Sequence, residues 1–520
     1  MEKTTQVGER PAPIALFNIR ALALPLLTAV GMALGFALRL RPVASADFPL
    51  NDGGMFYVAI QEIQRAHYHL PLELSYNGGI PFVYPPLAFY LATAVADLGG
   101  IGVTDVLRIL PLLFNALGVV AFIPLARGLL HSERSRTISL FAFALIPAGF
   151  VWLIMGGGLT RSLGFLCAIV TLASLRSFFA VPRFAVGAVA AAFSALTLLS
   201  HIEMAWFLAF SAALLLVPHR RSRSAVRGAF AIAGAALVLA SPWWVLVLAR
   251  HGPGPFLAAA TTGSLSNPVE QLLRFRETAE PHFPLFAALA LVGVVVCLAR
   301  RDYLLPGWLV ATGLLDARSF GAVSTVPMAL LVAVGVTGAI APLERDRRSL
   351  AVLAAAAIAY AAAGAVGAEP ELLRALTPSQ RAAMSWAAEN TPEDSRFVVV
   401  SEQSWASDRD GEWLPALTRR RSVATVQGTE WLPARAFWKQ LDRFDRAQEC
   451  GSAGVDCLEQ WSRDGGTPFD YVFLPKTKFG ERADGSAVWC CASLRAGLAA
   501  DPRYDLVYDG AGASIFARRP

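Results

Sequence analysis

Eleven apolar runs, each near the length of a membrane span, constrain this 520-residue chain more than any other feature. Several are short or adjoin one another, so the number is uncertain by about two. Hydrophobic residues make up 55% of the chain and charged residues only 16%, against about 25% in an ordinary soluble protein. The pattern predicts an α-helical polytopic membrane protein and excludes a wholly soluble enzyme. The runs are residues 21–38, 107–126, 137–155, 162–180, 184–200, 202–217, 228–249, 283–299, 303–315, 323–341 and 349–367.

Charge divides the chain into two parts. Residues 1–368 hold 26 Lys and Arg and 17 Asp and Glu, whereas residues 369–520 hold 19 and 22, so the net charge of +6 is +9 from the first part and −3 from the second. The positive excess lies beside apolar runs and the polar part is acidic, so nucleic acid is not an expected partner, and membrane lipids are. We expect a membrane domain over residues 1–368 and a separate domain over residues 369–520.

The basic residues also predict an orientation. If the eleven spans alternate, 17 Lys and Arg fall on the side of the N-terminus and nine on the other. The positive-inside rule then places the N-terminus on the cytoplasmic side of the cytoplasmic (plasma) membrane and residues 369–520 on its outer side.

Pro81–Leu98 is the segment that could invert this topology, since a span there would move every later basic loop to the other side. Pro85–Pro86 leaves only about 12 residues of uninterrupted helix, fewer than the ~20 that a span needs. We therefore expect helices on the outer surface at about residues 53–98. In one of them Phe56, Ile60, Ile63 and His67 would share one side.

The second part is predicted to be an extracytoplasmic α/β domain. Four short strand-like runs (397–401, 471–474, 504–508 and 514–517) are separated by helical stretches at about 379–389, 434–446 and 489–500. Four of the six cysteines fall here, which suggests one or two disulfides; four reduced thiols are the alternative. A bond between the adjacent Cys490 and Cys491 would be strained, so Cys450–Cys457 or long-range pairs are favoured, and the pairing stays open. Cys167 and Cys297 lie in spans and are expected to pack there.

Two carboxylates, Asp47 and Asp52, follow the first span and are the catalytic candidates. A carboxylate at the membrane surface could act as a general base or hold a divalent metal. The alternative is that Asp52 only caps the following helix.

A phosphate-binding group is predicted from two further outer segments. In the first, Gly157 and Gly158 offer backbone N–H groups while Thr160 and Arg161 add a hydroxyl and a guanidinium; in the second, Arg318 adds a cation. The alternatives are a tight hairpin whose Arg161 reaches the lipid headgroups, and a surface ion pair between Arg318 and Asp316.

Two more segments on the outer side, at residues 200–203 and 250–282, carry further ionisable groups. His201 and Glu203, with Asp316, are supporting residues or metal ligands, because ionisable groups at membrane depth are functional candidates; turn chemistry is the alternative. The long loop 250–282 is a lid candidate or a solvated connector with an amphipathic helix at Val269–Ala279.

The chain resembles the GT-C superfamily of integral-membrane glycosyltransferases, particularly the protein-mannosyltransferase and aminoarabinose-transferase branch. Asn51–Tyr57 is similar to the family's Asp-Glu-x-x-Tyr region, Tyr84–Tyr90 looks like its PPL-aromatic surface helix, and Arg108-Ile-Leu-Pro opens the next span as in that branch. Gly53 replaces the second acid of the usual pair, and Tyr84 stands where a charged residue often precedes the prolines.

The resemblance implies transfer of a sugar from a polyprenyl-phosphate donor to an acceptor on the outer face, in the cell envelope. Asp52 would be the base, and a divalent metal is a candidate cofactor. Protein, lipid and polysaccharide are open as acceptors, as are the sugar, the stereochemistry and the oligomeric state. Tryptophans interleaved with acids suit sugar stacking, so acceptor-binding candidates in the outer domain are Trp405, Asp408, Glu412, Trp413, Glu430 and Trp431. The rival readings are a lipid-linked glycan transporter or flippase and a non-catalytic assembly protein.

Overall fold

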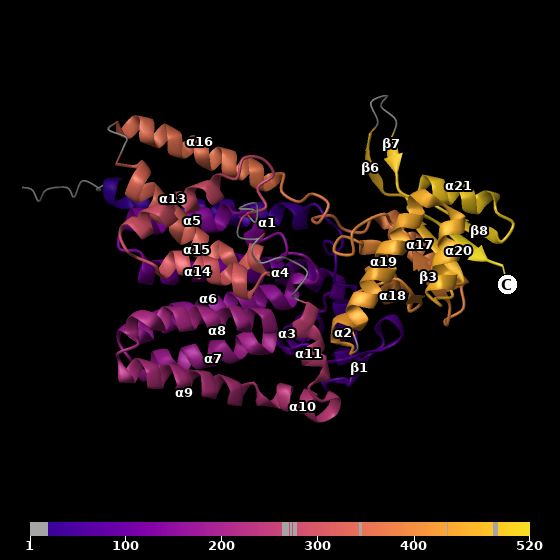
Figure 1. The fold of residues 1–520 in the computed structure, drawn as a ribbon, viewed down its shortest axis with the longest axis horizontal. Helices are drawn as coiled ribbons and strands as arrows, with labels where there is room; N and C mark the ends of the chain where they lie inside the picture. The colour runs from indigo at the N-terminus through magenta and orange to yellow at the C-terminus, as the bar shows by residue number, and fades with distance from the viewer. Residues whose placement is uncertain are drawn as a thin grey trace, which may run out of the picture.

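A computed structural model gives the fold of residues 19–262, 270, 273, 278–342, 346–433, 435–481 and 487–519. Figure 1 shows two parts: a bundle of long, roughly parallel helices, and a C-terminal domain that contains strands β3 to β9 and lies at one end of the bundle. We call this end of the bundle its domain-facing end.

The helices of the bundle follow the predicted apolar runs. Among the described residues, six helices are long and apolar enough to cross a membrane, and α9 with α10, bent by 59° at the break, would make a seventh. Three further runs form the shorter apolar helices α7, α13 and α14. The helical membrane fold is confirmed, whereas the number of eleven spans stays a prediction. The helices are α1 (Ile19–Ala44), α4 (Val103–Leu129), α5 (Glu133–Leu145), α6 (Gly158–Ala180), α7 (Phe184–Ser200), α8 (Ile202–Leu216), α9 (Arg223–Leu239), α10 (Ser241–His251), α13 (Leu285–Ala299), α14 (Leu304–Leu315), α15 (Phe320–Gly335) and α16 (Arg347–Val366).

The run predicted at 137–155 is helical only in its first part. The Ser132 side chain caps the start of α5, which ends at Leu145. Pro147 then opens the single turn η2 (Pro147–Gly149), because a proline lacks the N–H that would continue the helix. The chain continues irregularly to α6, and the Gly156 N–H meets the Leu50 carbonyl at the domain-facing end.

Two short helices occupy the segment between α1 and α4. They are α2 (Gly54–Arg65) and α3 (Leu87–Gly99), separated by the two-stranded pair β1 (Glu73–Leu74) and β2 (Ile80–Pro81) and by η1 (Tyr76–Gly78). Phe56, Ile60 and Ile63 are buried on one side of α2 as expected. The prediction is wrong for His67, which is exposed with a φ of 49° because α2 ends at Arg65.

The long loop after α10 is described only in part. The short helix α11 (Gly254–Thr261) begins two residues after Gly252, which has a φ of 67°. Most of the predicted amphipathic helix at Val269–Ala279 lies outside the described residues.

The C-terminal domain is an α/β fold around a five-stranded sheet of order β4-β3-β5-β9-β8. The pairs of β3 with β4 and β5 are parallel, and β9 pairs antiparallel with β5 and β8. All four predicted strands are present. The strands are β3 (Arg396–Val399), β4 (Arg421–Ser422), β5 (Tyr471–Pro475), β8 (Tyr504–Asp509) and β9 (Ala513–Arg518), with β6 (Lys478–Glu481) and β7 (Ala487–Trp489) as a separate pair.

Helices pack around this sheet. A capping box formed by Thr377 and Gln380 starts α17, with Pro378 in the first turn, where a missing N–H costs nothing. Three helices match the predicted stretches, while α18 and α20 were not predicted. They are α17 (Pro378–Asn390), α18 (Arg409–Thr418), α19 (Ala436–Ala453), α20 (Val455–Asp464) and α21 (Ala492–Ala500), with the turn η6 (Thr429–Trp431).

The domain holds two disulfides, Cys450–Cys457 and Cys490–Cys491. The first is the pair that the sequence favoured. The second contradicts the expectation against adjacent cysteines; Cys491 has a φ of 58° at the turn into α21. Cys167 and Cys297 are free and buried in the bundle, as predicted.

Backbone contacts tie the two parts together. Leu50 and Ala375 form an antiparallel bridge, and the Asn51 N–H donates to the Arg374 carbonyl at 2.7 Å. On the other side of the joint, Asn77 Oδ1 accepts the Ser422 N–H at 2.8 Å. The segment that contains Asp52 is therefore fixed between the bundle and the domain.

Candidate active site

Asp52 lies in the turn before α2, half-buried against the start of α6. Its Oδ1 accepts the Gly157 N–H at 2.8 Å. A Cβ at Gly157 would lie 2.4 Å from Asp52 Oδ2, so glycine lets α6 approach the carboxylate this closely. The Gly158 N–H donates to the Met155 carbonyl at 3.0 Å. The protein therefore already uses the two N–H groups that the sequence offered to a phosphate, and the glycine run positions Asp52.

Glu412 of α18 holds the same turn from the C-terminal domain. Its Oε1 accepts the N–H groups of Gly53 and Gly54 at 2.9 and 3.0 Å. Burial, and then the nearby Asp52 charge, raise the pKa of Glu412 to about 8. Burial also raises the pKa of Asp52, against the opposing effects of the Gly157 N–H and the Arg161 charge. Near neutral pH the two carboxyls therefore resist carrying two charges together.

Two more of the predicted acceptor-binding residues lie inside this joint. Trp413 is fully buried and its Nε1 donates to the Asn51 carbonyl at 3.0 Å. Asp408 is buried and caps α18 through the Gly411 N–H at 3.2 Å, and burial raises its pKa to about 6. Glu412 and Trp413 therefore connect the domain to the Asp52 turn, and Asp408 caps the helix that carries them.

A cluster of charges lies at the domain-facing ends of α8 and α15. Arg318 Nε lies 3.3 Å from Glu203 Oε1, and Arg318 Nη1 donates to Thr262 Oγ1 at 2.7 Å. The Ser319 hydroxyl donates to Glu203 Oε2 at 2.7 Å, while Asp316 Oδ1 accepts the Ser319 N–H at 3.2 Å. Arg318 therefore does not form the local ion pair with Asp316 that was one of the alternatives. It pairs instead with Glu203, which is more than 100 residues away in the sequence.

Two cavities meet at this cluster, with volumes of about 880 and 430 Å³. Arg161, Glu203 and Arg318 line both of them. Arg161 is otherwise bound only through Nη1 to the Trp152 carbonyl at 3.2 Å, among the contacts between described residues. The larger cavity has one apolar wall, formed by Trp206, Phe256, Leu314 and Leu315. The charged residues shared by the two cavities thus lie beside apolar side chains, a combination that suits an amphiphilic anion.

Three buried polar atoms at or near these cavities have no hydrogen-bond partner within the described part of the chain: Thr160 Oγ1, His201 Nδ1 and Asp316 Oδ2. His201 and Asp316 line the larger cavity. Burial lowers the pKa of His201 to about 3, so its imidazole is neutral near pH 7. Burial, and then the Glu203 charge, raise the pKa of Asp316 to about 7. Both side chains are therefore available to hydrogen-bond a polar ligand.

The predicted metal ligands do not form a compact donor set. Among the described residues, only Glu402, Cys490 and Cys491 bring three ligand atoms within 4.8 Å of one another, and the two cysteines are bonded to each other. His201, Glu203 and Asp316 do not meet this distance, and Glu203 is already paired with Arg318. This arrangement does not fit a three-ligand metal site.

The remaining candidates divide between surface and cavity. Asp47 is exposed and paired with Arg381 of α17 at 2.6 Å, and the bond from Arg381 lowers the pKa of Asp47. Trp405 lines the smaller cavity, and Glu430 and Trp431 line the larger one. Burial raises the pKa of Glu430.

Several cavity residues were missed from the sequence because they look like ordinary membrane or loop residues. Trp206 lies within an apolar run, and its Nε1 donates to the Leu315 carbonyl at 2.8 Å. Thr262 ends the short helix α11 and binds Arg318. The aromatic residue at 206, one turn after Glu203, is the only signal that could have marked this wall.

No protein-family model and no curated protein sequence matches the chain, but solved structures do share its fold. ArnT from Cupriavidus metallidurans bound to undecaprenyl phosphate is 13% identical, with a TM-score of 0.56 over 95% of this chain and 97% of that one. The archaeal oligosaccharyltransferase AglB from Archaeoglobus fulgidus, in complex with an inhibitory peptide and a dolichol-phosphate, is 12% identical, with a TM-score of 0.57 over 88% and 70%. The arabinofuranosyltransferase AftD from mycobacteria is 18% identical, with a TM-score of 0.55 over 96% of this chain and 40% of AftD.

All three are membrane glycosyltransferases of the GT-C superfamily. The chain has the GT-C fold. This confirms the fold that the sequence resemblance implied and, with the apolar helices, a multi-pass membrane protein. Another AglB structure, in complex with zinc and sulfate, is 14% identical with a TM-score of 0.55 over 89% of this chain and 72% of that one.

Proposed function

We propose that this protein is a membrane glycosyltransferase that moves a sugar from a polyprenyl-phosphate donor to an acceptor on the outer face of the cytoplasmic membrane. The observation that carries the proposal is the larger cavity, in which two arginines stand beside an apolar wall at the domain-facing end of a GT-C fold. The similarity to ArnT bound to undecaprenyl phosphate supports the class of donor.

The donor phosphate would bind between Arg161 and Arg318, with its aliphatic tail along Trp206 and the neighbouring leucines. Binding would draw Arg318 away from Glu203, and the guanidinium would exchange one carboxylate for the phosphate. His201 and Asp316, each with a free polar atom, would hydrogen-bond the phosphate or the sugar. As the bond from the sugar to the phosphate breaks, negative charge grows on the phosphate, and the arginines stabilise it.

Asp52 would act as the general base. An acceptor hydroxyl gives its proton to the Asp52 carboxylate, its oxygen forms a bond to the anomeric carbon, and the bond from that carbon to the phosphate oxygen breaks, releasing polyprenyl phosphate. Burial raises the pKa of Asp52, which makes its carboxylate a stronger base. Arg161 lies one helical turn after Gly157, whose N–H binds Asp52, so the start of α6 links the proposed base to the phosphate-binding group.

The orientation rests on the distribution of basic residues and places the C-terminal domain outside. No step is assigned to a metal ion, because no three His, Cys, Asp or Glu side chains of the described residues come together at this site. Acceptor binding is assigned to the smaller cavity, which Trp405 lines together with Arg161 and Arg318.

Replacement of Asp52 by Asn tests the base. We expect a loss of transfer of about 10²–10⁴-fold, with unchanged binding of the donor, measured with a radiolabelled polyprenyl-phosphate sugar on the purified protein. Asp97→Asn is the matched control, since Asp97 is an exposed carboxylate on α3 that binds Gln64 and Tyr68. Full activity of the Asp52 variant would remove Asp52 as the base. A wild-type protein that translocates such donors and transfers none of them would favour a transporter.

A further inference from the structure

A third cavity, of about 510 Å³, lies in the C-terminal domain and shares no residue with the two cavities of the candidate active site. One wall is the surface turn Asn77–Gly79, and the others come from β4, η6, α19 and the loop 466–468. Since Asn77 is also bonded to Ser422 of β4, this cavity exists only where the bundle's surface segment meets the domain.

The charges that line this cavity are all positive. They belong to Arg396, Arg421, Lys439 and Arg443, and no Asp or Glu lines it. Arg396 is neutralised by Asp470 at 2.7 Å. Within the described part of the chain, no carboxylate lies within 4.0 Å of the other three cations, so the cavity has unbalanced positive charge.

The rest of the lining suits a carbohydrate. Amide side chains (Asn77, Gln427 and Gln440) and hydroxyls (Thr425, Thr429 and Thr467) also line the cavity. No aromatic ring is among the described lining residues, so a sugar would be held by hydrogen bonds and not by stacking. Gln440 is held by its own bonds, since its Nε2 donates to two backbone carbonyls and its Oε1 accepts from Arg443. The three threonine hydroxyls donate to backbone carbonyls, so their oxygens keep lone pairs that can accept from sugar hydroxyls. The volume is in the range of small-ligand sites.

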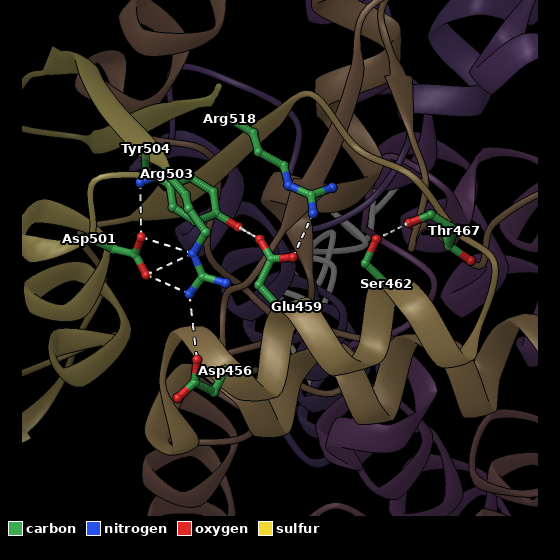
Figure 2. Close-up of polar contacts among 8 residues, drawn as sticks. All are labelled: Asp456, Glu459, Ser462, Thr467, Asp501, Arg503, Tyr504 and Arg518. Atoms are coloured by element: carbon green, nitrogen blue, oxygen red, sulfur yellow. Dashed lines mark hydrogen bonds and ion pairs between the residues drawn. The ribbon is translucent and has the colours of Figure 1, made fainter. Parts of the chain in front are cut away.

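The wall at 466–468 is held rigidly from behind. Figure 2 shows α20, where the Ser462 hydroxyl donates to the Thr467 carbonyl at 2.9 Å. One turn earlier, Glu459 accepts from Tyr504 and from Arg518, both at 2.5 Å. The loop that carries Thr467 is thus tied to a helix that is anchored to the sheet.

One short segment separates this cavity from the candidate active site. Gln427, Thr429 and Leu432 line the cationic cavity, while Glu430 and Trp431 line the larger cavity at Arg161 and Arg318. A molecule bound at Arg421 and Lys439 is therefore a few residues of chain away from the place where the donor would react.

We propose that the cationic cavity binds an anionic saccharide, a sugar that bears a carboxylate or a phosphate, as part of the acceptor. The identification of this ligand as part of the acceptor rests on the proposed function, whereas binding of the ligand does not depend on turnover. Arg421 and Lys439 contact the anionic group, and the amides and hydroxyls bind the sugar.

The test is calorimetric titration of the full-length protein in detergent with digalacturonate, glucose 6-phosphate and maltose. We expect at least one of the two anionic ligands to bind about tenfold or more tightly than maltose, with an affinity that falls as salt is added. The double variant Arg421→Gln/Lys439→Gln should lose about tenfold or more of that affinity. Both side chains are exposed, so the fold should tolerate the changes. Arg446→Gln is the control, because Arg446 is on the same helix, is exposed, and pairs with Asp442 outside the cavity.

Binding of digalacturonate alone would identify a carboxylate-bearing saccharide, and binding of glucose 6-phosphate alone a phosphate-bearing one. Equal affinity for maltose, no binding of either anion, or an unchanged affinity in the double variant would overturn the proposal. Failure of the proposed transfer reaction would be seen separately, in the radiolabelled donor assay, and would leave this binding result intact.

Discussion

Arginines line both the larger cavity of the bundle and the cationic cavity of the domain, but the burial and the ion pairing of the cations differ between the two sites. In the bundle, the Arg318 side chain is only 26% exposed and is paired with Glu203. In the domain, Arg421 and Lys439 are exposed and have no carboxylate within ion-pairing distance among the described residues. A charge withdrawn from water needs a partner, whereas an exposed one does not. An anion that binds Arg318 must therefore displace Glu203, whereas one that binds Arg421 or Lys439 displaces no carboxylate of the described residues.

The largest effect is expected where the buried pair is broken. Arg318→Gln removes a phosphate ligand and leaves Glu203 without its cation, so we expect kcat/KM for the donor to fall by about 100-fold and the protein to be destabilised by about 3 kcal/mol. Steady-state kinetics and thermal unfolding measure the two effects.

The double variant Glu203→Gln/Arg318→Gln sharpens the comparison. It should recover part of the lost stability without recovering activity, because no unpaired charge remains. Equal stability of the single and double variants would show that the pair is not effectively buried.

The next effect is one of pH and is expected at Glu412, a buried acid with no cation beside it. Its pKa of about 8 in the folded protein lies above the ordinary 4.5, so between these values the folded state holds a proton that the unfolded state has lost. Stability from this group is thus complete below about pH 4.5 and falls as the pH rises towards 8, by at most about 1.4 kcal/mol per pH unit. Glu412→Gln keeps an acceptor for the Gly53 and Gly54 N–H groups and should flatten this slope in thermal unfolding between pH 5 and 8. If the substitution leaves the slope unchanged, the pH dependence comes from other acids, such as Asp410, whose pKa is raised by burial to about 7.

The smallest effect is expected at the exposed pair of Asp47 and Arg381. The bond lowers the pKa of Asp47, so its contribution is present above the ordinary pKa and lost as the pH falls. With 59% of the Asp47 side chain exposed, water screens the pair, and Asp47→Asn should cost less than about 1 kcal/mol in chemical denaturation at pH 7. A larger loss would mean that this pair contributes to docking of the domain on the bundle.

Much of the fold follows from local pattern. Every predicted apolar run contains a helix, and the four predicted strands are present, because apolar runs and alternation report directly on burial. Two failures are at helix ends, at His67 and after Leu145, where a left-handed residue or a proline decides the boundary. Helices α18 and α20 and the Cys490–Cys491 disulfide were also not predicted.

The candidate site was predicted only as a collection of polar segments at span ends. That Arg161, Glu203 and Arg318 line the same cavities agrees with the expectation that these segments converge. The ion pair of Arg318 with Glu203 and the hydrogen bonds of Glu412 to the Asp52 turn were not predicted, because each contact joins residues more than 100 positions apart. The roles of these residues stay predictions until the variants are measured.

The sequence by itself determined the membrane class, the two-part organisation and the carboxylates and arginines worth testing, because hydropathy and charge are local quantities. Tertiary structure alone decided which of these charges neutralise one another and which stay free. That choice depends on which residues burial brings into contact, and a cation becomes a ligand site only where folding leaves it a cavity and a charge still to be matched.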